Sequence, residues 1–295
     1  MTKHAYLILA HKSKEQICKL LELLDHERND IYLHLDGKSK LKYSDFKSCC
    51  KKSGLFMATP RRTVSWGGVS IMRTELQLLR QATAGSYQYY HLLSGQDLPI
   101  KSQDAIHSFF DRNQGKEFLT LWENNEQTYN SFHYRTILPE NNRFFLAKKL
   151  KTMNLIFQKR HHKMVNRDME ESFASQWFSI TDAFAKYTVE HEKWLNSVFR
   201  RSGQTDELFL ATLLANSPFK DNLYDKTLYN EKDGVHSGGS MRYIDWTNSA
   251  NGRHPATLTA KDFDALMASD SFWARKFDIQ QDATIIDMIY NRLKA

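Results

Sequence analysis

The apolar run AYLILA at Ala5–Ala10 decides the fold prediction. A continuous apolar run of this length is typical of a strand that is buried on both faces of a sheet. Ser13 follows with the spacing of a capping box to Gln16, and apolar residues then recur at helical spacing from Ile17 to Leu24. The chain is therefore expected to begin with a buried strand and a helix, the first unit of an α/β fold.

The same alternation continues through the first half of the chain. Further strands are predicted at Ile31–Leu35, Leu55–Ala58, Gln88–Leu93 and Glu117–Leu121. Helices are predicted from Val69 to Leu79 and from Ser102, which offers an N-cap, to Phe110. Strands that alternate with helices predict a largely parallel sheet.

The second half is less regular. The patterns there predict a basic helix within residues 143–167, strands at Phe173–Ile180 and Met241–Trp246, and helices near Asp182–Phe199, Asp206–Asn216, Asp262–Ala268 and Ala283–Leu293. No repeat, low-complexity tract or linker divides the chain. We therefore expect one domain over residues 1–295, with a nucleotide-binding half at about 1–122 and a second half at 123–295.

Polar residues follow the predicted strands. His11 comes directly after the first strand, Asp36 after the second and Ser94–Asp97 after the fourth. The segment Ser65–Gly68 opens the helix that follows the third strand. Because ligands of open α/β sheets bind outside the carboxyl ends of the strands, these residues predict a nucleotide site in the first half.

Several common motifs are absent from the sequence. It has no GxGxxG after the first strand, no GxxxxGK[ST], no GxSxG and no HExxH, which argues against dinucleotide-binding, P-loop, serine-hydrolase and zinc-protease chemistry. The single DxD, Asp262–Asp264, falls in a predicted helix and is interpreted as a solvated helix face. We therefore expect no metal site. No apolar run in the sequence is long enough to span a bilayer.

The charge is concentrated in one segment. The chain has 41 Lys and Arg against 34 Asp and Glu, a net charge of +7, which suggests an anionic partner. Residues 143–167 hold eight of these cations and no acid, with apolar residues at helical spacing beside them. The three cysteines, Cys18, Cys49 and Cys50, form no CxxC pair and are predicted to be free thiols of a reducing compartment.

Several strings in the sequence are similar to the signatures of one family. They are HLLSGQDLPI at His91–Ile100, SWGG at Ser65–Gly68, SQWFS at Ser175–Ser179, DELF at Asp206–Phe209 and ARKFD at Ala274–Asp278. In this order they resemble family 14 of the glycosyltransferases, the core-2/I-branching β-1,6-N-acetylglucosaminyltransferases and peptide O-xylosyltransferases. The resemblance covers nearly the whole chain. It implies a GT-A-like, Rossmann-type sheet with a fused acceptor lobe, and inverting, metal-independent transfer from a UDP-sugar, with N-acetylglucosamine or alternatively xylose as the sugar.

The resemblance also implies roles for individual residues. Glu207 matches the family's catalytic base, and an inverting displacement needs such a carboxylate to take the proton of the attacking hydroxyl. Arg253 and Lys276 match two cations that hold the UDP diphosphate. Without a metal, cations of this kind stabilise the charge that grows on the leaving group. Read without the resemblance, Glu207 is an acid in a first helical turn, and the two cations are ordinary surface residues.

Further residues match, or lie in, the regions where the family binds its donor and acceptor, and the alignment of Glu123 and Arg135 to the acceptor region is loose. The donor set is His11, Asp36, Trp66, Asp97, Ser175, Gln176 and Trp177, and the acceptor set is Trp246, Glu123 and Arg135. Some have an alternative interpretation, because Asp97 could brace its own turn, His11 and Trp177 could belong to the core, and Trp246 could be a buried strand residue.

The sequence departs from the animal members of the family in lacking their membrane anchor, stem and disulfides. We therefore expect a bacterial, cytoplasmic version whose acceptor is a glycan or a lipid-linked polysaccharide precursor. A rival hypothesis is a non-catalytic protein that binds anionic membrane through residues 143–167, a pattern that suits an interfacial helix. The two are compatible, since an enzyme with a lipid-linked acceptor would need both. Nucleic acid is not expected as a partner, because no reader motif accompanies the charge.

Overall fold

The computed structural model describes residues 2–140, 145–230, 235–236, 238–248 and 254–294. The strands of its main sheet are β1 (His4–Ala10), β2 (Asn29–Leu35), β3 (Gly54–Met57), β4 (Tyr89–Ser94), β6 (Phe118–Trp122), β7 (Phe173–Thr181) and β8 (Leu228–Tyr229). In the described part of the chain they form a seven-stranded sheet in the order β3-β2-β1-β4-β7-β6-β8. Only β7 runs antiparallel to its neighbours. The predicted α/β fold with a largely parallel sheet is confirmed.

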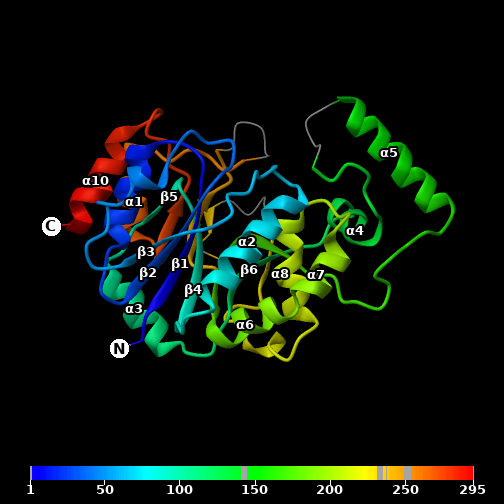
Figure 1. Ribbon diagram of the computed structural model, residues 1–295, viewed down its shortest axis with the longest axis horizontal. Helices are drawn as coiled ribbons and strands as arrows, with labels where there is room; N and C mark the ends of the chain where they lie inside the picture. Colours follow the sequence, from blue (N-terminus) through cyan, green and yellow to red (C-terminus); the bar gives the residue numbers. More distant parts are fainter. Residues whose placement is uncertain (1, 141–144, 231–234, 237, 249–253, 295) are drawn as a thin grey trace.

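Helices cover both faces of this sheet (Figure 1). One group comprises α1 (Lys14–Leu24), α3 (Gln103–Arg112), α9 (Phe263–Ala268) and α10 (Ala283–Lys294). The other comprises α2 (Val69–Ala82), α6 (Asp182–Glu190), α7 (Glu192–Phe199) and α8 (Thr205–Ala215). Alternate side chains of β1 point to opposite faces of the sheet. Ile8 packs in the hydrophobic cluster that includes residues of α1 and α10, and Leu7 packs in the cluster that includes residues of α2 and α8. The first strand is buried on both faces, as its apolar run predicts.

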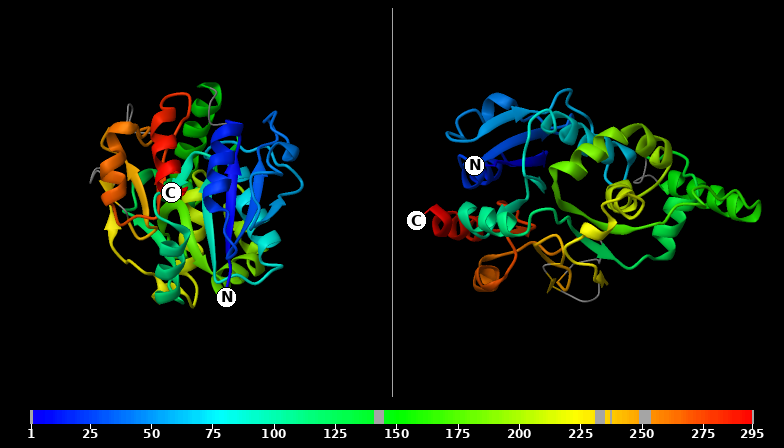
Figure 2. Two further views of the ribbon diagram at one scale, coloured as in Figure 1. Left: turned by 90° about the vertical axis from the view of Figure 1, so that its left-hand side faces the viewer. Right: turned by 90° about the horizontal axis from the view of Figure 1, so that it is seen from below.

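Two further helices lie beyond the layers. They are α4 (Glu126–His133) and α5 (Phe145–Arg160), and α5 projects at the end of the long axis away from both chain termini (Figures 1 and 2). The basic helix predicted within 143–167 is thus confirmed over 145–160. The helix predicted over 182–199 is divided into α6 and α7 at His191.

A smaller sheet brings the end of the chain to the strand ends of the main sheet. It consists of β5 (Asp97–Pro99), β11 (Trp273–Arg275), β10 (Arg242–Asp245) and β9 (Val235–His236). Both sheets therefore take strands from both halves of the chain. The N–H of Phe277 donates to the Gln96 carbonyl, 2.8 Å away. This pairing sets Lys276 beside the turn that follows β4.

The predicted capping box at the start of α1 is wrong. Ser13 has a φ of 63° and its side chain makes no capping hydrogen bond. Gln16 is buried instead, where its amide nitrogen donates to the Phe277 carbonyl and its amide oxygen accepts from the Ile279 N–H, each at 3.0 Å. The side chain is thus bonded to the C-terminal segment, a partner that local sequence spacing does not reveal.

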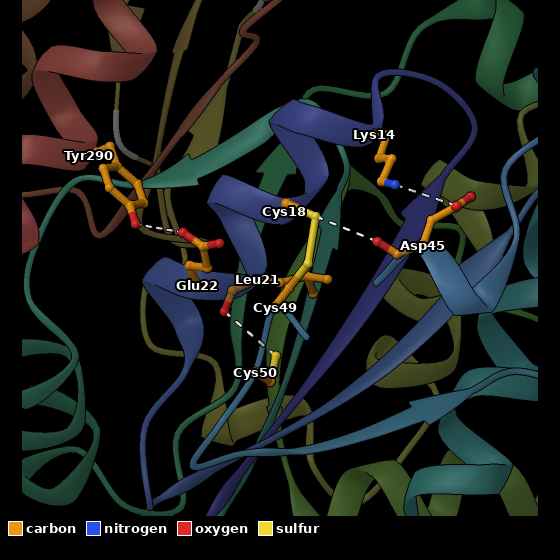
Figure 3. The surroundings of a disulfide bond; sticks show 8 residues. All are labelled: Lys14, Cys18, Leu21, Glu22, Asp45, Cys49, Cys50 and Tyr290. Carbon is orange, nitrogen blue, oxygen red and sulfur yellow. Dashed lines mark hydrogen bonds and ion pairs between the residues drawn. A yellow bond between two sulfur atoms is a disulfide. The ribbon is translucent and has the colours of Figure 1, made fainter. Parts of the chain in front are cut away.

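The prediction of free thiols is wrong for two of the three cysteines. Cys18 of α1 and Cys49 form a disulfide, with their Cα atoms 5.5 Å apart (Figure 3). The two residues are 31 positions apart in the sequence, and the packing of α1 against the segment after the short helix Tyr43–Asp45 brings them together. Cys50 is a free thiol, and burial raises its pKa to about 12.

Candidate functional site

A cavity of about 830 Å³ lies between α4, α5, the start of α8 and the loop before α2. Four of the residues singled out in the sequence line it: Glu207, Trp66, Arg135 and Trp246. Its other walls include polar side chains of α4 and α5 together with Gln204. The volume lies in the range of small-molecule sites, and the four residues come from distant parts of the chain. The fold thus collects a carboxylate, a cation and two aromatic rings around one cavity.

Glu207 lies in the first turn of α8. Its N–H donates to the Gln204 carbonyl at 3.2 Å, and one carboxylate oxygen accepts from the Gln204 side-chain amide, also at 3.2 Å. A carboxylate is favoured here by the positive end of the helix dipole. The side chain is partly exposed at the cavity wall, so an incoming hydroxyl can reach it. This is the placement that a general base requires.

A buried pair of carboxyl groups lies behind this turn. Asp206 is buried, and one of its oxygens has no hydrogen-bond partner among the described residues. Glu75 of α2 is fully buried, and burial followed by the Asp206 charge raises the pKa of Glu75 well above its usual range. Burial also raises the pKa of Asp206. Glu75 accepts a 2.6 Å hydrogen bond from the Gln176 side chain, which ties this predicted donor residue to α2.

The loop before α2 forms the next wall. The hydroxyl of Thr205 donates to the Gly68 carbonyl at 2.9 Å, which fastens this loop to the first turn of α8. Trp66 is 57% exposed, and its ring lies 5.3 Å from that of His254. An accessible indole face offers a stacking surface for a sugar or a base. The assignment of Trp66 to the donor stays a prediction.

Trp246 follows β10 directly and is not part of the strand. Its ring packs edge-on against Trp122 at 6.3 Å and also lines the cavity. The indole N–H is buried without a hydrogen-bond partner in the described part of the chain. Arg135 is exposed, and its backbone is held by Gln158 and Asn154 of α5. Both residues therefore border the cavity, and their contact with an acceptor stays a prediction.

The carboxyl ends of β1 and β11 bring cations together. Lys276 is partly buried there, and burial, with the positive charges of Arg275 and Lys12, lowers its pKa. Lys12 pairs with Asp278 at 2.7 Å. Asp278 offsets part of the repulsion among these cations, and a bound anion such as a diphosphate would offset more of it. The sequence reasoning missed Lys12, although it follows His11 at a strand end. Arg253 lies outside the described residues.

Other predicted donor residues serve mainly to brace the structure. Asp97 is 2% exposed and accepts from the N–H and hydroxyl of Ser94 at 2.8 and 2.9 Å, so it braces its turn. Asp36 accepts from the backbone N–H groups of Lys38 and Val64 at 2.7 and 3.1 Å. These bonds fix the loops at the strand ends. Neither residue lines the cavity.

The remaining predicted residues are divided between core and surface. Trp177 is buried, with the guanidinium of Arg275 lying 3.7 Å from its ring centre. Ser175 is partly exposed on β7, and His11 is exposed after β1. Glu123 accepts from the Asn230 side chain at 2.8 Å and does not line the cavity. The core interpretation thus holds for Trp177 and not for His11.

The described residues offer no evident metal site. No group of three or more His, Cys, Asp or Glu side chains is arranged there to hold a metal ion. Within the same ranges no helix is both long and apolar enough to cross a bilayer.

Comparison with known proteins identifies the family. The family described as Core-2/I-Branching enzyme matches residues 4–267. The chain therefore belongs to the core-2/I-branching enzymes, the glycosyltransferase family 14 that its motifs resemble.

Individual relatives are more distant. Xylosyltransferase 2 of Rattus norvegicus is 24% identical over 307 residues, which cover 98% of this chain and 33% of that protein. Xylosyltransferase 1 of Homo sapiens is 24% identical over 303 residues, 97% of this chain and 30% of that protein. The chain thus spans about a third of the length of these relatives. A solved structure of mouse xyloside xylosyltransferase 1 in its apo form aligns over 93% of this chain and 97% of that one, with 9% identity and a TM-score of 0.41.

Proposed function

We propose that this protein is an inverting glycosyltransferase that moves a sugar from a UDP-sugar to a hydroxyl group of a glycan or lipid-linked saccharide. The observation that carries the proposal is the position of Glu207, held by Gln204 at the wall of a cavity that Trp66 and Trp246 also line. Membership of the family supports a nucleotide-sugar donor.

The chemistry is a single displacement. The acceptor oxygen loses its proton to Glu207 and forms a bond to the anomeric carbon, while the bond from that carbon to the diphosphate breaks. The electron pair leaves with UDP. Lys276 and Lys12, together with Arg253 as the resemblance implies, would stabilise the charge on the leaving diphosphate. In this scheme the cations take the place of a divalent metal.

Two donor sugars are candidates. The sequence motifs resemble both kinds of enzyme and do not separate UDP-N-acetylglucosamine from UDP-xylose, whereas the relatives found are named xylosyltransferases, which favours UDP-xylose. We propose N-acetylglucosamine first and xylose as the alternative. A bacterial source and contact with an anionic membrane complete the proposal. The cytoplasmic location expected from free thiols loses that support, because Cys18 and Cys49 form a disulfide.

The test is UDP release from each sugar nucleotide, measured with and without EDTA in the presence of simple saccharide acceptors. We expect turnover of at least one donor, unaffected by EDTA. Glu207→Gln should lower kcat by about 10²- to 10⁴-fold, because it removes the base and keeps the shape. Glu190→Gln is the matched control, since Glu190 is exposed at the end of α6 and does not line the cavity, and it should leave kcat nearly unchanged. Turnover that survives Glu207→Gln would refute the assignment of the base.

A further inference from the structure

The helix α5 is turned the opposite way from an ordinary surface helix. Its large apolar side chains, Phe145, Leu146, Leu150, Met153, Ile156 and Phe157, are between 40% and 82% exposed. The residues of α5 that are buried are Ala147 and Gln158. A surface helix normally packs its apolar stripe on the core and turns its polar face to water. We call these six exposed residues the α5 stripe.

Polar bonds attach α5 to the body of the protein. The side-chain amides of Asn154 and Gln158 each donate to the Arg135 carbonyl at 2.8 Å, and Lys159 pairs with Glu126 at 3.1 Å. The same side of the helix contributes Lys151, Asn154, Leu155 and Gln158 to the wall of the cavity that contains Glu207. The α5 stripe therefore faces away from the body while the opposite face forms part of the candidate site.

Cations accompany the α5 stripe. Lys148, Lys149, Arg160 and Lys163 are exposed, and residues 145–167 contain no acidic residue. A second copy of the helix would bring the same positive charges against these and supply no carboxylate from its own segment. An anionic surface complements them. Apolar side chains that enter the hydrocarbon boundary beside lysines that meet acidic headgroups are the features of an interfacial helix.

We propose that the α5 stripe docks this protein on an anionic lipid bilayer, and that the acceptor is a saccharide carried by a lipid of that bilayer. Docking follows from the stripe and its charges alone, whereas the acceptor rests on the proposed function. The helix lies in the interface with its outer face in the lipid and its inner face on the cavity. A saccharide headgroup that stands up from the membrane then enters the cavity beside α5.

Flotation with vesicles tests the docking step. We expect the protein to float with phosphatidylcholine vesicles that contain phosphatidylglycerol, and to do so less as salt is added. Replacing Lys148 and Lys149 by glutamine should lower the partition coefficient about fivefold per lysine. The double variant Ile156→Ser and Phe157→Ser should lower it by about tenfold or more per side chain.

Matched controls separate docking from unfolding and from catalysis. Leu228→Ser removes a side chain that is 60% exposed, as is Ile156, on the main sheet, and should leave flotation unchanged. Because the α5 stripe is exposed, its variants should keep the melting temperature of the wild type. Glu207→Gln should float like the wild type, so a failure of the proposed function leaves the docking result standing.

Three results would overturn the docking proposal. They are no flotation with anionic vesicles, equal flotation of the wild type and the stripe variant, and a wild-type dimer that the stripe variant converts to a monomer without any binding to vesicles. For the acceptor, the stripe variant should lose activity on a vesicle-embedded saccharide lipid and keep it on a soluble saccharide. Equal losses on both would refute a membrane-carried acceptor.

Discussion

Two buried histidines, His4 of β1 and His107 of α3, should make the stability of the protein sensitive to acid. His107 of α3 is 1% exposed, and its ring lies 4.2 Å from that of His4. Neither ring nitrogen has a hydrogen-bond partner among the described residues. Burial, followed by the charges of Arg28 and His26, lowers the pKa of His107 from 6.5 to about 4. The folded protein therefore holds this ring neutral at a pH where the unfolded chain would protonate it.

The sign and size of the effect follow from linkage. Between pH 6.5 and about 4 the unfolded state binds more protons, so the stability that the neutral ring contributes is present above 6.5 and declines as the pH falls. For a shift of this size the loss on going from neutral pH to about pH 5 is about 2 kcal/mol. The variant His107→Phe keeps a ring of similar size and cannot titrate. Its free energy of unfolding should fall by about 2 kcal/mol less than that of the wild type over this interval.

Urea unfolding of both proteins at the two pH values measures this difference. Other groups titrate in both proteins and cancel, including Glu117, whose pKa burial raises to about 7. His4, whose pKa is lowered by burial and by His107, would be relieved in the variant, which acts in the same direction. An identical loss of stability in wild type and variant would refute the reasoning, because it would mean that His107 is protonated in the folded state.

Three further predictions concern the site and the disulfide. Lys12→Gln should weaken inhibition by UDP about tenfold, because it removes one charged hydrogen-bond donor. The control variant Lys40→Gln changes an exposed lysine and should leave inhibition by UDP unchanged. Equal inhibition constants for the two variants would show that Lys12 does not contact the diphosphate. Reduction of the Cys18–Cys49 disulfide, which closes a loop of 31 residues, should lower the free energy of unfolding by about 4 kcal/mol and the melting temperature by about 6 °C. A thermal unfolding transition that dithiothreitol leaves unchanged would contradict this. Glu75→Gln keeps an oxygen acceptor for Gln176 and should leave kcat within about twofold. Glu75→Ala leaves the Gln176 amide unpaired and should lower kcat about tenfold. Equal rates for the two variants would show that this hydrogen bond does not position the site.

The parts of the fold that could be predicted are those that local patterns determine. The run Ala5–Ala10 predicts β1 to within one residue, because a strand buried on both faces needs apolar side chains on both. The N-cap at Ser102 is also confirmed, since its hydroxyl accepts from the Ala105 N–H. The misread features depend on distant partners: Gln16 bonds to the C-terminal segment and Cys18 to Cys49. Nothing in the spacing of these residues identifies those partners.

The candidate site divides in the same way. The resemblance to the family singled out Glu207, Trp66, Arg135 and Trp246, which the structure places around one cavity. They did not indicate Glu75, because a glutamate inside an amphipathic helix pattern resembles any solvated residue until its burial is known. Burial changes what a carboxyl group can do, since it holds a proton that an exposed carboxyl would release.

The orientation of α5 decides between two meanings of one sequence pattern. Apolar residues at helical spacing beside lysines describe equally a helix packed on the core and a helix that lies on a membrane. The choice depends on which face the body of the protein binds, and that is set by Gln158 and Asn154, whose amides hold the Arg135 carbonyl. With those polar side chains turned inward, the α5 stripe must face out.

The net charge of +7 can be assigned to one segment of the chain. Residues 143–167 carry eight cations and no acid, whereas the rest of the chain carries 33 cations and 34 acids. Its excess therefore accompanies the α5 stripe, whereas Lys12 and Lys276, which we propose hold the diphosphate, belong to a part of the chain that is nearly neutral.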